Sequence, residues 1–293
     1  MFNFFMPLFY LSPTSFSGEL AFGILQKLIE KGNRYYSSPK REESITDMKT
    51  HFSCPKWMVQ KFEVFDADEN QTYTLENHIC RFQPTKKNRV LLGTHYDTRM
   101  WAEESLNPFL RNRPIVGAND GSSGVAVFAA LSHLISASSL DVGVDIVLFD
   151  GEEFGRPKTN DYCQGSRYLA KNLHEFYDDE HLLQRVLVID MVGDKDLLFR
   201  SEKNTQRKYP EFYQEFWAIG KEVNEKVFVD GSYGGIIDDH SPFADRGIPS
   251  LLLIDFDYPY WHTHQDTLDK CSKKSLQIVG DVIWKWLNTL DSL

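Results

Sequence analysis

The spacing of apolar side chains predicts a helix near each end of the chain. Apolar residues recur at helical spacing over residues 18–31, and they line one face over residues 274–290. The polar stretch 33–43 predicts a loop, and residues 44–51 predict a second, short helix.

A β-hairpin is expected next. Residues 57–65 and 73–82 alternate apolar and polar side chains, and the turn-rich segment 66–71 lies between them. Such alternation is typical of paired strands with one buried face.

Beyond the hairpin, short apolar runs alternate with helical segments. This order is typical of crossover units, in which strands run parallel and helices cover the sheet. The sequence therefore predicts a single α/β domain with a mixed, mostly parallel central sheet flanked by helices on both faces. The expected strands are 90–93, 144–149, 186–189 and 250–254, and the expected helices are 122–136, 166–176 and 210–223.

Composition narrows the class of partner. The 293 residues, 42% of them hydrophobic, suffice for one substantial core, and 32 basic against 42 acidic residues give a net charge of −10. This charge argues against nucleic acid and anionic membranes as main partners, and it permits a cationic group such as a peptide's amino terminus. No run reaches the roughly 20 apolar residues of a membrane span. Nothing in the sequence defines the oligomeric state.

Residues 1–17 are compatible with two interpretations, and residues 18–293 are expected to form the catalytic domain. The first ten residues are apolar but lack a basic flank and a clean cleavage pattern, so they fit either an export segment or one that packs on the domain. Export to the periplasm and a cytoplasmic location therefore both stay open. The four cysteines form no CxxC pair, which argues against a thiolate zinc knuckle and leaves the redox compartment open.

The candidate functional residues, which are mostly acidic, lie where the predicted strands end. Ligands of open crossover sheets bind at the carboxyl ends of the strands. Acids crowded at this edge repel one another unless a proton or a cation intervenes, and histidine with carboxylates is a ligand set suited to zinc, with manganese or cobalt as substitutes. The strand-end residues are His95, Asp97, Asp150, Glu152, Glu153, Asp190 and Asp255.

Three further segments contribute to this prediction. Asp120 lies in a glycine-rich loop before a predicted helix, where an ordinary helix cap is the alternative interpretation. Adjacent Glu152 and Glu153 diverge, so one can bind a metal while the other faces the substrate as a general base. His262, next to Trp261, would be a packed core histidine in isolation, but the strand-end acids favour a ligand. The serines after Asp120 lack the GxSxG elbow of a serine hydrolase.

The sequence resembles the zinc peptidase family that contains co-catalytic aminopeptidases and animal-type glutaminyl cyclases, and its motifs follow one another in the same order as in that family. The resemblance is closest to the bacterial glutaminyl-peptide cyclotransferases, and it covers about residues 90–265. The matching motifs are Gly93–Asp97, Val116–Asp120, Phe149–Glu153, Gly165–Leu169, Leu187–Gly193, Asp238–Phe243, Arg246–Pro249 and Trp261–Thr263.

The resemblance implies a set of roles. Asp120, Glu153 and His262 would bind one zinc ion, with the fourth position open to water or substrate. Glu152 would act as the acid/base. In aminopeptidase relatives, His95 and Asp190 would hold a second metal bridged by Asp120, and Asp97 would orient His95. One zinc is therefore expected, and a second is compatible with the sequence.

Three activities are weighed. A glutaminyl cyclase, which converts an N-terminal glutamine to pyroglutamate and releases ammonia, is favoured because Trp261 and the loop 232–240 resemble the cyclase pattern. That resemblance places Trp261 and Ile237 in the substrate pocket, and it joins Asp238 to Glu152 and Asp190 in an acidic network. A dizinc aminopeptidase and an inactive binding protein are the alternatives.

Two departures from the animal cyclases alter the expected pocket. Their tryptophan after the paired glutamates is absent from 154–158, and Asp257 replaces a phenylalanine.

Overall fold

The computed structural model describes residues 15–157 and 159–290. Within these ranges, a six-stranded sheet has the order β1-β2-β4-β3-β5-β8. β1 pairs with β2 and β2 with β4 in antiparallel fashion, whereas β4, β3, β5 and β8 are parallel neighbours. The strands are β1 (Trp57–Asp66), β2 (Gln71–Phe82), β3 (Asn88–His95), β4 (Gly143–Phe149), β5 (Leu182–Asp190) and β8 (Ser250–Ile254). The predicted mixed, mostly parallel sheet is confirmed.

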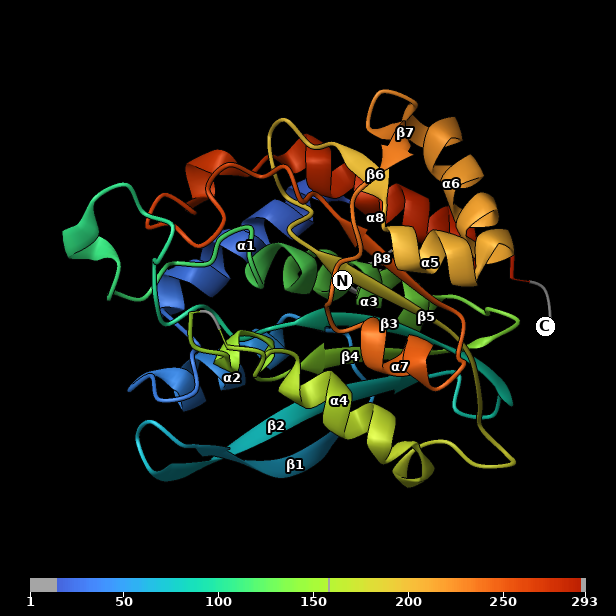
Figure 1. Cartoon of the computed structure of the whole chain (residues 1–293). Coiled ribbons are helices and arrows are strands. Elements are labelled where there is room, and N and C mark those ends of the chain that lie inside the picture. Colours follow the sequence, from blue (N-terminus) through green and yellow to red (C-terminus); the bar gives the residue numbers. More distant parts are fainter. Residues whose placement is uncertain (1–14, 158, 291–293) are drawn as a thin grey trace, which may run out of the picture.

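Helices cover both faces of this sheet, as predicted (Figure 1). One face carries α1, α3 and α8, with α6 packed beside α8, and the other carries α4 and α7. Their bounds are α1 (Gly18–Lys31), α3 (Ser122–Ala137), α4 (Gln164–Lys171), α6 (Pro210–Asn224), α7 (Ser241–Asp245) and α8 (Lys273–Leu287). The remaining elements are α2 (Arg41–Thr50), α5 (Lys203–Lys208), the short parallel pair β6 (Phe199–Ser201) and β7 (Phe228–Ser232), and the 3-10 turns η1 (Pro108–Leu110), η2 (Glu152–Phe154), η3 (Leu173–Glu175) and η4 (Leu268–Lys270).

Alternation along the strands divides the core between the two faces. Val90 and Leu92 of β3 pack with α1, α3 and α8, whereas Leu91 between them packs with α4 and α7. Because successive side chains of a strand point to opposite faces, a strand covered on both sides is apolar throughout. This is why the central strands appear in the sequence as continuous apolar runs.

Local signals explain several element ends. The Ser17 hydroxyl accepts a hydrogen bond from the Leu20 amide at 3.1 Å and caps α1, and Gly32 ends that helix at a φ of 108°. Asp66 accepts hydrogen bonds from the amides of Asp68 and Glu69, which closes the β1–β2 turn.

Some predicted boundaries were wrong. α2 begins at Arg41, inside the predicted loop 33–43, and the side chain of Arg41 is buried in an ion pair with Asp150. The predicted helix 166–176 is divided into α4 and η3, which meet at Asn172. α5, α7, β6 and β7 were not predicted, since their runs are too short to show a period.

The terminal segment 1–17 is only partly described, because residues 1–14 lie outside the described ranges. Phe16 is buried beside Gly280 of α8. Among the described residues, we find no helix that is long and apolar enough to cross a bilayer.

Candidate active site

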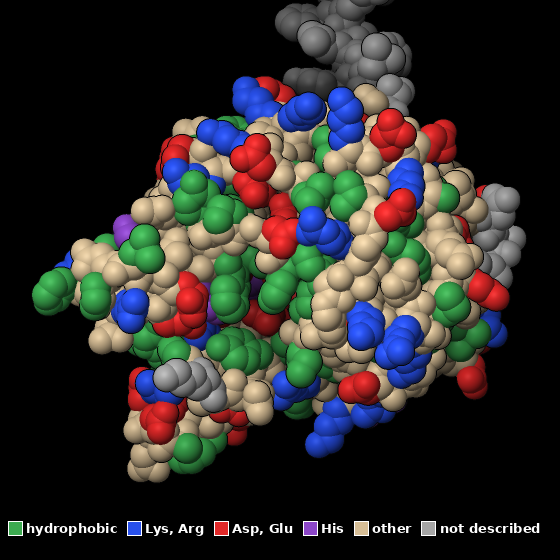
Figure 2. Space-filling view, turned by 45° about the horizontal axis from the view of Figure 1, so that its top comes forward, with side chains coloured by type: hydrophobic (Ala, Val, Ile, Leu, Met, Phe, Trp, Pro, Cys, Tyr) green, Lys and Arg blue, Asp and Glu red, His purple; other side chains and the backbone are tan. Residues whose placement is uncertain are grey.

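The predicted site residues converge on one cavity at the carboxyl edge of the sheet. Its volume is about 660 Å³, within the range of roughly 300–1,000 Å³ that is usual for ligand pockets. Figure 2 shows a hollow with acidic side chains in its depth and hydrophobic side chains around it. The predicted residues that line it are Asp120, Glu152, Glu153, Asp190, Ile237, Asp238, Trp261 and His262.

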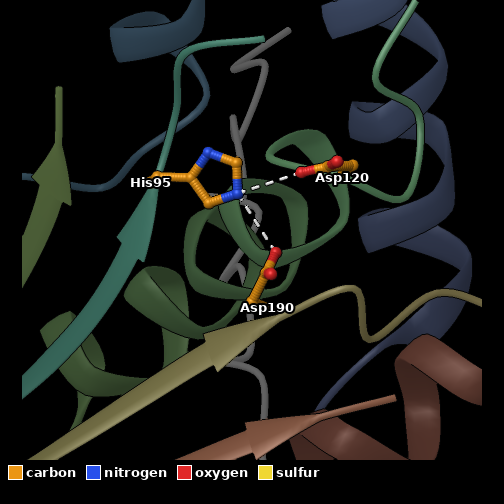
Figure 3. A group of neighbouring side chains, drawn as sticks. All are labelled: His95, Asp120 and Asp190. Atoms are coloured by element: carbon orange, nitrogen blue, oxygen red, sulfur yellow. Dashed lines mark hydrogen bonds and ion pairs between the residues drawn. The ribbon is translucent and has the colours of Figure 1, made fainter. Parts of the chain in front are cut away.

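Two clusters of possible metal ligands meet at Asp120. In each of the clusters, the ligand atoms lie within 4.8 Å of one another, and every member is buried. The first consists of Asp120, Glu153 and His262. The second consists of His95, Asp120 and Asp190 (Figure 3).

Asp120 lies between two histidines. Its Oδ1 is 3.3 Å from His95 Nε2, and its Oδ2 is 3.7 Å from His262 Nε2. His95 Nε2 is also 3.1 Å from Asp190 Oδ1, and His262 Nε2 is 3.2 Å from Glu153 Oε1. One carboxylate could therefore serve both clusters.

Asp266 fixes the loop that carries Asp120 by hydrogen bonds to its backbone. Its carboxylate accepts hydrogen bonds from the amides of Asn119 and Asp120, at 2.8 and 3.2 Å. Gly121 follows with a φ of 81°, and a Cβ there would lie 2.4 Å from the Asp97 carbonyl oxygen. Only glycine allows this approach, so the glycine-rich motif has a steric cause.

His262 itself has a φ of 51°, in the left-handed region that costs a non-glycine residue about 1–2 kcal/mol. Its ring stacks on that of Trp261, with 3.8 Å between the ring centroids. Met191, directly after Asp190, and Cys163, which contacts Glu152, have φ values of 47° and 59°. Strained backbone therefore gathers around the cavity.

Arg99 and Glu103 support the ligands and were not predicted. Arg99 is fully buried and donates from Nη1 to Glu153 Oε2 at 3.1 Å, while its Nε and Nη2 bind Glu103. Glu103 Oε1 lies 3.0 Å from His262 Nδ1. This Arg99–Glu103 pair therefore fixes two of the three members of the first cluster. Its sequence signal is an arginine and an acid four residues apart, directly after the motif Gly93–Asp97.

The pKa values of the acids diverge. Burial, followed by the charge of Glu153, raises the pKa of Asp120 and of Glu152 well above the usual range. Burial acts in the same direction on Glu153, but His262 and Arg99 outweigh it and lower the pKa of Glu153. Burial, followed by the charge of Asp190, raises the pKa of Asp238 to about 6. The cluster thus carries more carboxylates than its own cations neutralise.

These residues fit a divalent cation. Asp120 Oδ2 is buried without a hydrogen-bond partner, as are His95 Nδ1 and Asp97 Oδ1. A cation bound among the carboxylates would supply the partner that Asp120 Oδ2 lacks. Its charge would also stabilise the ionised form of the buried carboxylates, which burial disfavours. The described residues therefore hold a candidate metal site.

Other strand-end acids have different roles. Asp150 pairs with Arg41, and Asp255 accepts a hydrogen bond from the Leu198 amide; neither acid lines the cavity. The prediction that all strand-end acids gather at the metal was wrong for these two. Asp97 lies 3.5 Å from His95 Nδ1 and also accepts a hydrogen bond from the Glu153 amide at 3.0 Å.

The replacement of a phenylalanine by Asp257, noted in the sequence, leaves the cavity with an aromatic side chain from the neighbouring position. Asp257, which replaces the expected phenylalanine, forms an ion pair with Arg200. Phe256 lines the cavity instead, with its ring centroid 6.2 Å from that of Trp261.

The α/β fold and the paired acid and histidine clusters define the class: an α/β fold with a candidate metal site at the carboxyl ends of its parallel strands. The model of peptidase family M28 matches residues 77–287, and the chain belongs to this family.

Similar proteins include both cyclases and aminopeptidases. The chain is 26% identical over 239 residues to a glutaminyl-peptide cyclotransferase of Bos taurus, a match that covers 72% of this chain and 64% of the bovine protein. A Bacteroides thetaiotaomicron glutaminyl cyclase structure superposes with a TM-score of 0.87 at 25% identity, covering 95% of this chain and 99% of that one. A leucine aminopeptidase precursor from the same organism gives the same TM-score and identity, with 95% and 98% covered.

Proposed function

We propose that this protein is a zinc-dependent glutaminyl-peptide cyclotransferase, which acts on peptides with a free N-terminal glutamine. The observation that carries the proposal is the position of Glu152 in one cavity with the cluster of Asp120, Glu153 and His262, under a wall formed by Trp261. The similarity to glutaminyl cyclases over most of the chain supports it.

In this proposal, Asp120, Glu153 and His262 would hold the zinc ion, which would supply Lewis acidity to the side-chain carbonyl of the substrate glutamine. Trp261 and Ile237 line the pocket around that side chain. Because the amine and the carbonyl belong to one residue, a pocket that enforces their approach supplies much of the rate.

Glu152 moves the proton. Its carboxylate takes a proton from the α-amine as the nitrogen bonds to the side-chain carbonyl carbon, and it delivers that proton to the departing ammonia. Asp190 and Asp238 line the same cavity and would hold the amine. The Cys163 thiol donates to Glu152 Oε1 at 3.3 Å and helps to fix the base.

A dizinc aminopeptidase is the second candidate, because the cluster of His95, Asp120 and Asp190 is complete. With a metal there as well, Glu152 would activate a water molecule instead of the substrate amine. The cyclase remains our first choice.

One experiment separates the two candidates. Purified protein of known zinc content is incubated with Gln-Phe-Ala and Leu-Phe-Ala, and the products are analysed by mass spectrometry. Loss of ammonia from the first peptide alone, at about one zinc per chain, supports the cyclase. Release of free leucine at about two metals per chain contradicts it and supports the aminopeptidase.

We also propose that the protein works in an oxidising compartment, with residues 18–293 as its catalytic domain. Cys54 and Cys80 form a disulfide, and such bonds are rare in the cytosol of mesophiles. Peptide mapping of non-reduced protein from its source cells should recover the linked pair; two free thiols would contradict this location.

A further inference from the structure

The candidate active-site cavity is strongly asymmetric in charge. Five carboxyl groups line it, and the described lining residues include a single Lys or Arg, which is Arg167. Four of the five acids are buried and Glu152 is half-buried, whereas Arg167 is exposed. The cavity therefore has an acidic interior and one cation at its rim.

The backbone fixes Arg167 relative to the proposed base. The amide of Cys163 donates to the Glu152 carbonyl oxygen at 3.1 Å, and the amide of Gln164 donates to the Gly151 carbonyl oxygen at 3.0 Å. The amide of Arg167 then donates to the Cys163 carbonyl oxygen at 3.0 Å. Arg167 thus extends from a helical turn that is bonded to the loop of Glu152.

The guanidinium group of Arg167 has unused donors. Its Nη1 donates to the Asn160 carbonyl oxygen at 3.2 Å, and no carboxylate among the described residues forms an ion pair with it. A guanidinium offers five N–H donors in a planar fork that matches a carboxylate. Arg167 lines the cavity and is exposed, so a bound ligand can reach these donors.

We propose that Arg167 binds a carboxylate of the peptide substrate, carried one or two residues after the N-terminal glutamine. The inference rests on the proposed function, because it places the peptide's amine among the interior acids. The carboxylate could come from an acidic side chain or from the free C-terminus of a very short peptide. Both sources present the same group to the fork of Arg167.

The overall charge of −10 opposes this preference at long range, so a comparison of anionic and neutral peptides in the wild type alone is insufficient. Lys171 provides a matched control. It is exposed on the same helix, it does not line the cavity, and Lys171→Gln removes the same charge as Arg167→Gln.

The test measures kcat/KM for ammonia release from two pairs of peptides at low salt. The first pair is Gln-Ala-Glu-amide and Gln-Ala-Gln-amide, and the second is Gln-Ala with a free C-terminus and Gln-Ala-amide. For at least one pair, Arg167→Gln should lower the ratio of anionic to neutral substrate about three- to tenfold, as expected for a partly solvated charge-assisted contact. Lys171→Gln should change it less than about twofold. The pair that responds identifies the source of the carboxylate.

Equal changes in both variants, or no change in either, would overturn the role of Arg167. In those cases the neutral peptides would still be cyclised, and the proposed function would stand. If the wild type releases no ammonia from any of the four peptides, the proposed function fails, and this inference fails with it.

Discussion

Replacing Glu103 with glutamine should weaken zinc binding without removing a proposed ligand. Glu103 Oε1 lies 3.0 Å from His262 Nδ1, 3.0 Å from Arg99 Nε and 2.5 Å from Arg99 Nη2, so one oxygen binds both residues. In Glu103→Gln the neutral amide loses the charge that strengthens both contacts, and its NH₂ group can face His262 unfavourably. His262 would then turn more freely about its side-chain bonds.

The expected loss of zinc affinity can be estimated from other residues that hydrogen-bond to a metal-binding histidine. Losing such a partner typically lowers metal affinity about 10- to 100-fold, which corresponds to about 1.4–2.7 kcal/mol. Both partners of Glu103 are almost completely buried, with His262 3% exposed and Arg99 0% exposed. Water therefore replaces the lost contact poorly, and we expect a value in the upper half of this range.

The assay is competition for zinc between the protein and a chromophoric chelator, with folding checked by circular dichroism. Glu104→Gln is the matched control, because Glu104 is the exposed neighbour and loses the same charge. If Glu103→Gln binds zinc within twofold of the wild type, or if both variants weaken equally, the orienting role of Glu103 is wrong.

Four further predictions follow from the same structure. Glu152→Gln should lower kcat at least 100-fold while zinc content is unchanged, and a fully active variant would refute its role as base. His262→Ala should lose zinc, as measured by metal analysis after dialysis; full retention would contradict its role as a ligand. Glu202 caps α5 and binds the Ile236 amide, and although burial acts the other way, hydrogen bonds led by His240 lower its pKa to about 2. The charged carboxylate therefore stabilises the fold above its unfolded-state pKa of 4.5, and this stabilisation is lost as the pH falls towards 2. Glu202→Gln should lower the free energy of unfolding by about 1–2 kcal/mol at pH 7, measured by urea unfolding. The difference between variant and wild type should disappear in acid. Cys80→Ser, which opens a loop of 26 residues, should cost about 3 kcal/mol in the same measurement, and an unchanged midpoint would show that the bridge does not constrain the chain.

The central fold could be predicted because buried positions recur along the sequence with a period that depends on the type of secondary structure. Strands covered on both faces read as apolar runs, and long helices read as apolar stripes. Short elements such as α5, α7 and β6 carry too few residues to show either period. The disulfide between Cys54 and Cys80 was not predicted, since 26 positions separate its cysteines and only the β1–β2 region brings them together.

The proposed site could be predicted in part. Strand-end placement indicated that Asp190 and Glu153 would meet, but the same rule wrongly included Asp150 and Asp255. Both of these acids follow a strand, yet each finds a nearer partner: Arg41 for the first and the Leu198 amide for the second. Strand ends therefore place an acid near the edge of the sheet, and its local partners decide whether it faces the cavity.

Arg99 makes the pKa of one acid in the cavity differ from those of its neighbours. By binding Glu153 Oε2, it helps to lower the pKa of Glu153, whereas burial, followed by the charge of Glu153, raises the pKa of Asp120 and of Glu152. A ligand with a lowered pKa can attract a cation first, and Asp120 can ionise as the cation binds. Charge repulsion between Glu153 and its neighbours is then smaller before the metal binds, and Arg99 already fixes the position of the Glu153 carboxylate.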